Sequence, residues 1–467
     1  MSKKLLNHFQ SANLSVEDRM AAGKALRKKI PRISQGKYQP ATKRADPISI
    51  LEAQGKTRVA ALVPIRYARM LTSPFAFLRG GAAIMALDLA AQGKTTGINV
   101  QACGDMHVAN FGVFASTERK LIFGINDFDE TLPGPWEWDL KRLVSSIVAS
   151  GRCMGANENL CKRAVSAAVR SYRKRMKQYA YMGNLELWYS TITEKDILKT
   201  LTPAQKKSLK KITAKARERN HLQVLGKLTD LVGDQYRLRV NAPFIVRETH
   251  SEKGKPIYEA LGQLLESYID SLADDRKKLL KHYRIVDVVR KVVGVGSIGT
   301  RCWIIFLSGN DANDPLFLQV KEAQPSVLEA VTSKSTYTNH GQRVVAGQRL
   351  IQGTPDIFLG WGELDGYHFY VRQLRDMKGG VEFDPDKVQI ENLPEYSRLC
   401  AWAMALAHAK SGDAAMISGY IGSNDELEKA MTRFALAYAD QTEKDYQALV
   451  AAATTGRIKV AKAESQS

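Results

Sequence analysis

The sequence predicts an α+β protein with a mainly helical lobe and a second lobe built on a five-stranded antiparallel sheet. Apolar residues recur at helical spacing through much of residues 51–282 and again in residues 381–467. Between these segments, residues 283–380 are rich in β-branched and aromatic residues, with turn signals between the runs. Hydrophobic residues make up 44% of the chain, which is enough for a large buried core.

Charge and cysteine content narrow the class of protein. The 68 Lys and Arg against 48 Asp and Glu give a net charge of +20, which favours nucleic acid, anionic lipid or a polyphosphate ligand as partner. A basic solubilising surface is the alternative. The five cysteines include no C-x-x-C pair, so a disulfide framework or structural zinc site is not expected. With no apolar run near the ~18 residues of a membrane span, we expect a soluble, cytoplasmic protein.

The helical lobe is predicted to follow a basic N-terminal arm. Residues 1–50 are basic and polar, and we expect an arm or a loosely packed cover there. The first helices break at Ser73 and Pro74, because proline interrupts the helical hydrogen-bond ladder. Two short strands and a further helix come next. Residues 158–282 then form a helical insertion dense in Lys and Arg, and residues 381–467 return to the helical lobe as C-terminal helices.

The sheet lobe is predicted from five strand-like runs. Three strands lie within residues 283–323, a helix covers about residues 326–350, and two strands follow at 356–364 and 367–377. The connection that leaves this sheet, residues 372–380, corresponds to the segment where a nucleotide base lodges in kinases.

A glycine-rich turn joins the first two of these strands. Gly294, Gly296 and Gly299 spell G-x-G-x-x-G, and the strand-like run TRCWIIFL follows them. A Rossmann unit would continue as a helix, so the glycines and Ser297 belong to a hairpin like the phosphate-covering loop of kinases. Glycine allows backbone N–H groups to approach phosphate closely. A plain hairpin turn is the alternative.

Lys321 ends the next strand, LFLQVKEA, just before a predicted helix. This position is that of the lysine that pairs with nucleotide phosphates in kinases. Glu329 on the helix is the favoured ion-pair partner of Lys321, and Glu322 is the alternative. A lysine with surface charge alone is the simpler interpretation.

Three motifs earlier in the chain resemble those of aminoglycoside- and choline-type kinases. GDMHVANFGVF (residues 104–114) resembles their G-D-x-H-x-x-N catalytic loop, and INDFDE (125–130) resembles their metal-binding segment. PGPWEWDLKRL (133–143) resembles the start of the helix that follows there. The motifs occur in the same order as in those kinases.

The resemblance implies a role for each polar residue of the first two motifs. Asp105 would accept the proton of the attacking hydroxyl, and Asn110 and Asp127 would hold Mg²⁺ against the phosphates of ATP. Asp129 would hold a second ion, and these hard oxygen ligands suit Mg²⁺ or Mn²⁺. His107 either acts directly as a catalytic residue or, as is commoner in such loops, braces the backbone.

One residue is expected to anchor this loop, and two depart from the kinase pattern. Asp139 begins the next helix and is expected to hold the loop in place. Cys103 stands where small-molecule kinases usually have a histidine, which leaves the orientation of Asp105 open. Arg301 stands two residues after the last glycine, where kinases prefer valine. This difference would alter how the hairpin covers the adenine of ATP.

The parts occur in the reverse of the usual kinase order, since the catalytic-loop motif precedes the glycine hairpin. This order indicates circular permutation of a two-lobe protein-kinase-like fold. Residues 396–413, YSRLCAWAMALAHAKSGD, resemble the helix that normally leads into the catalytic loop, yet they stand near the C-terminus. Domain termini often lie close together, so such rearrangement is physically tolerable. An unrelated β domain with a coincidental motif is the alternative.

The chain as a whole resembles a bacterial domain-of-unknown-function family, number 2252, from about residue 46 to 413. The most specific stretches are the motifs above and LVPIRYARMLTSPFAFLRG, which contains Arg66, Arg69, Ser73 and Arg79. These residues either contact an acidic ligand or tie the first helices to the catalytic loop.

The motifs together predict an ATP- and Mg²⁺-dependent phosphotransferase that acts on a hydroxyl or amine acceptor. One alternative is transfer of AMP from ATP to a protein, if the nucleotide lies reversed in the cleft. The other is a non-catalytic protein that binds a nucleotide, or binds nucleic acid or another acidic partner through its basic helices.

Overall fold

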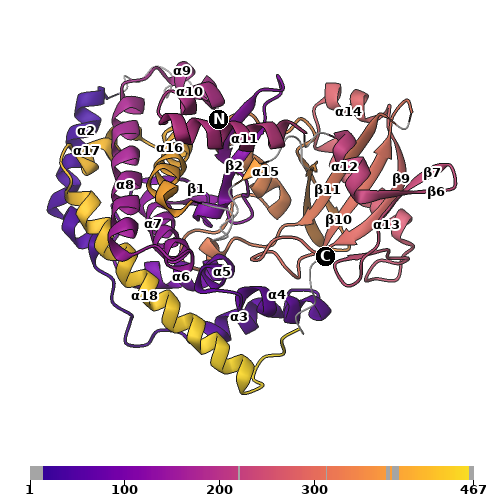
Figure 1. Ribbon diagram of the computed structural model, residues 1–467, viewed down its shortest axis with the longest axis horizontal. Helices are drawn as coiled ribbons and strands as arrows, with labels where there is room; N and C mark the ends of the chain where they lie inside the picture. Colours follow the sequence, from indigo (N-terminus) through magenta and orange to yellow (C-terminus); the bar gives the residue numbers. More distant parts are fainter. Residues whose placement is uncertain (1–13, 219–220, 312, 375–378, 381–388, 462–467) are drawn as a thin grey trace, which may run out of the picture.

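The computed structural model describes residues 14–218, 221–311, 313–374, 379–380 and 389–461. Its helices and strands form two lobes that lie side by side, one mainly helical and one built around a sheet (Figure 1). The mixed α+β class predicted from the sequence is confirmed. Of the predicted connection after the last strand, residues 375–378 lie outside the described residues.

The large sheet has six strands in the order β12-β13-β11-β10-β9-β8, and all neighbouring pairs are antiparallel. The strands are β8 (Ile245–Val246), β9 (Arg284–Lys291), β10 (Cys302–Ser308), β11 (Pro315–Glu322), β12 (Gly360–Leu364) and β13 (Tyr367–Gln373). The five predicted strands are present, but the predicted count was one too low. The additional edge strand β8 has two residues and comes from the segment expected to be helical.

Helices from residues 221–282 cover this sheet, so the predicted helical insertion belongs in part to the sheet lobe. The apolar face of α13 (Ile257–Asp270) packs on one side, where its residues Leu264 and Tyr268 join the same buried cluster as strand residues. On the other side, residues of α12 (His221–Leu228) cluster with Phe306 and Phe317. Two shorter elements, β6 (Thr229–Val232) and β7 (Gln235–Leu238), pair as a hairpin, and α14 spans Asp274–Leu280.

The helix predicted for residues 326–350 is two separate elements. A short 3-10 helix, η5, spans Val327–Ala330, and α15 spans His340–Ile351. Ser326 caps the first and Asn339 caps the second, and each side chain accepts a backbone N–H bond. The intervening residues have turn and bend geometry, so the chain reorients between the lobes here.

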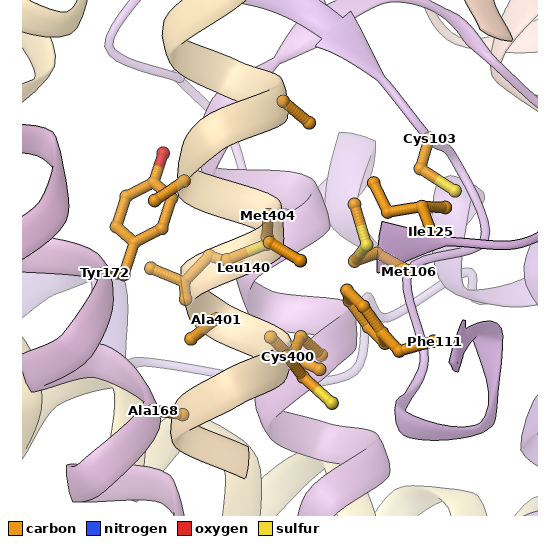
Figure 2. Packing of buried hydrophobic residues seen from close by; sticks show 14 of the residues in the cluster. Cys103, Met106, Phe111, Ile125, Leu140, Ala168, Tyr172, Cys400, Ala401 and Met404 are labelled. Atoms are coloured by element: carbon orange, nitrogen blue, oxygen red, sulfur yellow. The ribbon is translucent and has the colours of Figure 1, made fainter. Parts of the chain in front are cut away.

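The helical lobe joins segments from both ends of the chain around one core. Its long helices are α7 (Trp136–Cys153), α8 (Glu158–Ala180), α16 (Leu393–Ser411), α17 (Ala414–Ile421) and α18 (Glu426–Thr454). Figure 2 shows Tyr172 of α8 and Met404 of α16 packed in the same cluster as Cys103 and Phe111. The predicted return of the C-terminal helices to this lobe is confirmed, and their core reaches the GDMHVANFGVF segment.

Residues 14–50 of the predicted N-terminal arm form helices and turns that pack on the helical lobe, and the first thirteen residues lie outside the described part of the chain. Helix α2 (Val16–Ala25) lies against α17, and Gly23 approaches the carbonyl of Met416 so closely that a Cβ would lie 2.0 Å from its oxygen. The next elements are η1 (Leu26–Lys28), η2 (Arg32–Gly36), α3 (Pro47–Gly55), η3 (Ala60–Leu62), α4 (Val63–Met70), α5 (Pro74–Gly80) and α6 (Ala82–Ala91). Ser73 caps α5 at the predicted break.

The region of the quoted motifs contains four strands where two were predicted. β1 (Asn99–Ala102) pairs with β4 (Leu132–Pro135), and β2 (Phe111–Ala115) pairs with β3 (Leu121–Ile125). Strands β5 (Ile192–Thr193) and β14 (Gly379–Gly380) extend the second sheet. The remaining helices are η4 (Val108–Asn110), α9 (Asn184–Tyr189), α10 (Glu194–Leu198), α11 (Pro203–Glu218) and η6 (Ile390–Asn392).

Two further features concern possible acidic or membrane partners: ion pairs that use basic residues of α8, and the hydropathy of the helices. Basic residues of α8 are partly neutralised within the chain, because Arg170 and Arg173 both pair with the buried Glu428 of α18. Among the helices of the described residues, none alone has the length and hydropathy of a membrane span. Helices α5 and α6 meet that test only when counted together, and they are bent by 77°.

Candidate functional site

The GDMHVANFGVF segment forms a tight turn between β1 and β2 that is held from outside. Gly104 adopts a φ of +77°, and a Cβ there would lie 2.5 Å from the carbonyl oxygen of Glu130, so glycine is required. Asp139, at the start of α7, accepts hydrogen bonds from the backbone N–H groups of Cys103 at 2.7 Å and Gly104 at 3.0 Å. The predicted anchoring role of Asp139 is confirmed.

A second contact fixes Asp139 itself. Nε2 of His408 on α16 lies 3.2 Å from Oδ2 of Asp139, and Nδ1 of His408 lies 2.8 Å from the hydroxyl of Tyr172. All three side chains are buried. Helix α16 therefore helps to orient the loop through a residue 269 positions after Asp139 in the sequence.

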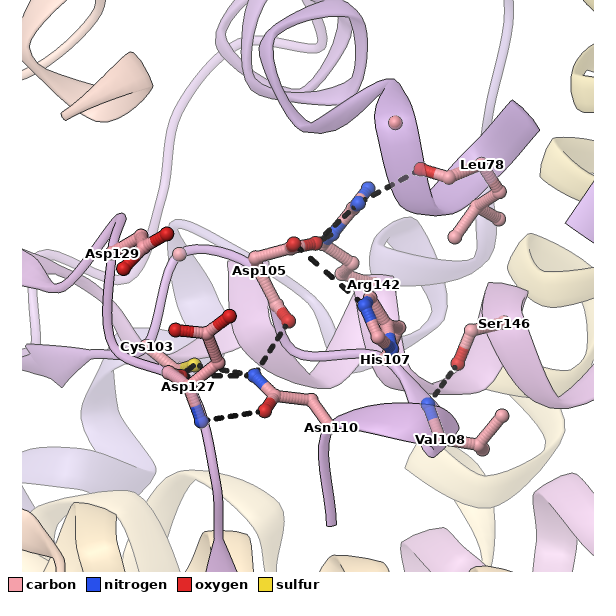
Figure 3. Close-up of polar contacts among 12 residues, drawn as sticks. Leu78, Cys103, Asp105, His107, Val108, Asn110, Asp127, Asp129, Arg142 and Ser146 are labelled. Carbon is pink, nitrogen blue, oxygen red and sulfur yellow. Dashed lines mark hydrogen bonds and ion pairs between the residues drawn. The ribbon is translucent and has the colours of Figure 1, made fainter. Parts of the chain in front are cut away.

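Asp105 points from this turn toward Arg142 of α7 (Figure 3). The Arg142 guanidinium donates to Oδ1 of Asp105 from Nε at 2.8 Å and from Nη2 at 2.5 Å, and it also donates to the carbonyl oxygen of Leu78. The second oxygen, Oδ2, lies 3.7 Å from Nε2 of His107. One oxygen of Asp105 is thus held in place, and the other faces the cavity described below.

His107 is buried and stands beside Asp105. The pKa of His107 is lowered to about 4, mainly by burial and also by nearby Arg79 and Arg142, while Asp105 opposes the shift. The imidazole is therefore neutral at pH 7. Its backbone N–H donates to the carbonyl oxygen of Asp105 at 3.0 Å, and its ring packs edge-on against Phe75. These contacts favour the bracing role over direct chemistry.

Asn110 joins the two motifs instead of presenting a free oxygen. Its Oδ1 accepts from the backbone N–H of Asp127 at 2.8 Å. Its Nδ2 donates to the carbonyl oxygens of Asp105 at 3.2 Å and Asp127 at 3.0 Å. The predicted metal ligand Asn110 is here a brace, because both ends of its amide already bond the backbone of the neighbouring motif (Figure 3).

Lys321 reaches the carboxylates of the helical lobe from β11. Its Nζ lies 3.5 Å from Oδ2 of Asp127 and contacts Oδ2 of Asp129. Tyr370 on the neighbouring strand β13 donates its hydroxyl proton to Oδ1 of Asp129 at 2.7 Å. Burial alone would lower the pKa of Lys321, but Asp127 and Asp129 raise it overall, so the ammonium stays charged. Lys321 of the sheet lobe therefore meets two carboxylates of the INDFDE segment in the helical lobe, whereas Asp105 is paired with Arg142.

The predicted ion pair between Lys321 and Glu329 is wrong. Glu329 caps η5, where its carboxylate accepts the backbone N–H of Ser326 at 3.2 Å. Glu322, the alternative, pairs with Arg301 at 2.9 Å. Lys321 instead takes its partners from INDFDE, because β11 ends opposite that segment.

The glycine segment is the hairpin loop between antiparallel β9 and β10, as predicted. Gly294 and Gly299 have φ values of +74° and +93°, which favour glycine. At Gly296 a Cβ would lie 3.2 Å from the carbonyl oxygen of Arg79 and 4.0 Å from Oδ2 of Asp105. Arg69 donates to the carbonyl oxygen of Gly294 at 2.7 Å. The loop therefore lies over Asp105, and Arg69 ties it to α4.

Two adjoining cavities lie along these residues. The smaller, of about 250 Å³, is lined by Asp105, His107, Asp127, Asp129 and the glycine loop from Gly294 to Ser297. The larger, of about 650 Å³, is lined by residues of β2, β11, β13 and the end of β9. Asn126, Gly294 and Arg372 line both cavities, so the two cavities are neighbours.

The carboxylates of the smaller cavity suit a hard cation that shares its ligands with a substrate. The Asp127 side chain is 45% exposed, and that of Asp129 is 24% exposed. No three His, Cys, Asp or Glu side chains of the described residues are grouped to hold a metal ion. Mg²⁺ at phosphoryl-transfer sites takes one or two carboxylates and completes its shell with waters and phosphates. Asp127 and Asp129 fit that pattern.

Sequence reasoning missed several residues of the site. Arg142 on α7 is buried, with 3% of its surface exposed. The sequence indicated this residue only through a charged side chain on the otherwise apolar face of WDLKRL. Tyr370 and Arg372 reach the site only through strand pairing, which no motif marks.

Burial raises the pKa of Glu130 to about 7, although its carboxylate accepts the N–H of Val327 at 2.7 Å.

The comparison with family profiles covers most of this architecture. Residues 58–452 match a family described as uncharacterized proteins conserved in bacteria, DUF2252. The chain belongs to the DUF2252 family. The matched range contains the GDMHVANFGVF segment, the glycine hairpin, Lys321 and His408, so both lobes of the candidate site fall within the DUF2252 region. No curated protein and no solved structure matches this DUF2252 chain.

Proposed function

We propose that this protein is an ATP- and Mg²⁺-dependent phosphotransferase with a circularly permuted, protein-kinase-like arrangement of its two lobes. One observation carries the proposal. Lys321 of the sheet lobe meets Asp127 and Asp129 of the helical lobe beside a cavity that Asp105 lines and the glycine loop covers. A cation from one lobe, carboxylates from the other and a glycine hairpin are the parts that phosphoryl transfer needs.

The position of α16 supports the permuted arrangement. The hydroxyl of Ser411, the last residue of α16, accepts the backbone N–H of Gln101 in β1 at 3.1 Å. The helix that would precede the catalytic loop in an unpermuted kinase therefore ends beside the strand that leads into that loop. A kinase chain opened between this helix and the loop, with its original ends joined, would have a new connectivity and the same packing.

The two cavities suggest how ATP would lie. The larger cavity would take the base and ribose, because it adjoins the last strand of the sheet lobe, and the smaller would take the phosphates. Lys321 would contact the phosphates, while Asp127 and Asp129 would hold Mg²⁺, which neutralises phosphate charge when bound. Binding between the lobes would fix them relative to each other.

Asp105 would serve as the base. An acceptor hydroxyl or amine placed beside Oδ2 of Asp105 would attack the terminal phosphorus of ATP. A new bond from the acceptor to phosphorus would form, the bond from phosphorus to the ADP oxygen would break, and the acceptor proton would pass to Asp105. Arg142, bound to Oδ1, would keep Oδ2 aimed at the acceptor.

Ligand-dependent melting and product mass test this function. ATP with Mg²⁺ should raise the melting temperature. At a ligand concentration 100 times Kd, binding adds about 2.7 kcal/mol to the free energy of unfolding. Asp127→Ala should lose most of the gain, whereas Asp440→Ala, which removes an exposed carboxylate, should keep it. An unchanged wild-type melting temperature at saturating ATP would count against the proposal.

The reaction type is tested separately with a lysate and metabolite screen. Incubation with γ-labelled and α-labelled ATP, followed by intact mass of the product, separates phosphate transfer from AMP transfer. Label from the γ position that appears with wild type and is lost with Asp105→Ala supports the phosphotransferase. Label from the α position would support the nucleotidyltransferase instead.

A further inference from the structure

Three arginines from the N-terminal helical segment converge on the smaller cavity. Arg58 precedes η3, Arg66 lies on α4 and Arg79 lies on α5, and all three line the 250 Å³ cavity together with Asp105. None of them lines the larger cavity. This group, the arginine cluster, therefore belongs to the smaller cavity, which Asp105 and Glu130 also line.

The arginine cluster has buried nitrogen atoms without partners. Arg66 is fully buried, and its Nε and Nη1 have no hydrogen-bond partner, while its Nη2 donates to the neutral oxygens of Gln54 and Gly80. The Nε atoms of Arg58 and Arg79 are likewise buried and unpaired. Among the described residues, no carboxylate pairs with any of the three guanidiniums.

Of the carboxylates that line the cavity, Glu130 is the one not paired with another cation among the described residues: it accepts the backbone N–H of Val327 and acts on Arg58 and Arg66 electrostatically, without an ion-pair contact. The other carboxylates are paired with other cations. Asp105 is held by Arg142 and Asp129 by Lys321. Glu322 pairs with Arg301. The positive charge of the arginine cluster therefore remains uncompensated by a contacting acid.

An unpaired buried charge is costly, so this arrangement calls for an anion. Burial lowers the pKa of Arg66, which expresses the same cost, yet guanidinium groups keep their proton in proteins. A phosphate group offers several oxygen acceptors, and planar guanidiniums bind it with paired N–H donors. Carboxylate side chains of the protein would have served if the cluster were purely structural, and none is in contact.

We infer that Arg58, Arg66 and Arg79 form a phosphate-binding subsite beside Asp105, separate from the contact that Lys321 makes. The inference rests on the proposed function, and it assigns the ligand of this subsite to the phosphate-monoester class. The phosphate is either the terminal one of the nucleotide or one carried by the acceptor. In both cases the subsite places a phosphate group next to the proposed base.

The test measures binding of inorganic phosphate to the full chain by calorimetry, at constant ionic strength. Wild type should bind phosphate, and Arg79→Gln should weaken it roughly 10-fold or more, since hydrogen bonds to charged groups are lost. Arg79 makes no hydrogen bond to the described residues, which makes its variant the least disruptive. Arg349→Gln is the control, because Arg349 is exposed, donates to the Leu359 carbonyl and lies outside the cavity.

Absence of phosphate binding in wild type, or equal binding by Arg79→Gln, would overturn the inference. If Arg79→Gln does not fold, Arg58→Gln carries the same expectation. Competition identifies the source of the phosphate. If inorganic phosphate competes with ATP but not with AMP, the terminal nucleotide phosphate occupies the subsite. If phosphate and ATP bind together, the acceptor supplies it. If the protein binds phosphate but not ATP, the subsite is supported and the proposed function is contradicted. If it binds ATP but not phosphate, only the subsite is contradicted.

Discussion

Nζ of Lys321 lies 3.5 Å from Oδ2 of Asp127, although 194 residues separate them in the sequence. The lysine side chain is 3% exposed, and it joins the two lobes through Asp127 and Asp129. This buried contact is both the basis of the proposed nucleotide site and a structural link between the lobes. The two roles make separable predictions.

Replacement of Lys321 by Met should destabilise the protein by roughly 3 kcal/mol, because two carboxylates would lose their buried cation. Urea unfolding measures the loss. Lys199→Met is the control, since Lys199 forms a comparable pair with Asp196 at 65% exposure, and an exposed pair contributes only about 0–1 kcal/mol. Equal losses in both variants would show that the Lys321 contact does not link the lobes.

Asp105→Asn should retain ATP binding and lose turnover by about 10²–10⁴-fold, the usual contribution of a general base.

Arg142→Gln should lower kcat with little change in the KM for ATP, because Arg142 orients Asp105 and does not line the larger cavity, where the nucleotide base is proposed to bind. Arg142→Lys should restore part of kcat. Arg152→Gln, on the same helix but paired with an exposed aspartate, should match wild type. A KM effect without a kcat effect would remove Arg142 from the positioning role.

The buried neutral His107 should make stability fall as the solution is acidified. The unfolded chain takes up a proton on this residue near pH 6.5, but the folded chain does so only near the lowered pKa of about 4. Between those values protonation favours unfolding, with a slope of up to about 1.4 kcal/mol per pH unit. His107→Gln should flatten the stability profile in this window, and a variant of the exposed His282 should not. An unchanged slope in His107→Gln would contradict the prediction.

Gly104→Ala should be more harmful than a left-handed backbone alone explains. Gly104 and Gly155 have φ values of +77° and +82°, but a Cβ meets Glu130 at 2.5 Å in the first case and no atom within 4 Å in the second. Gly155→Ala should cost roughly 1–2 kcal/mol. Gly104→Ala should cost about 1–3 kcal/mol more because of the clash, and should abolish turnover. Thermal unfolding of both variants provides the comparison.

Local patterns predicted only part of the structure: the five longer strands of the large sheet are present, but the strand counts and the single helix at residues 326–350 were wrong. The glycine hairpin, the helix that starts at the PWEWDL motif and the anchoring by Asp139 follow from residues close together in the sequence. The encounter of Lys321 with Asp127 was predictable only through the order of motifs. The choice of Asp129 over Glu329 as partner was not, because ion pairing depends on which segment a strand end faces after folding.

The elements that the sequence did not reveal have physical explanations. Strand β8 has only two residues, too few for a periodic pattern, and it is defined by pairing with β9. The arginine cluster combines residues from three helical segments whose convergence no spacing encodes. The DUF2252 membership likewise gives the extent of the domain and no reaction.

The bond between His408 and Asp139 has a consequence for synthesis of the protein. A ribosome delivers the loop at Cys103 and Gly104 and its anchor Asp139 long before it delivers His408, so the nascent polypeptide carries Asp139 without the histidine that fixes it. Prematurely terminated products would thus display the motif yet lack the assembled centre. The bond to Asp139 can form only after α16 has been synthesised, so the loop gains this support late in translation.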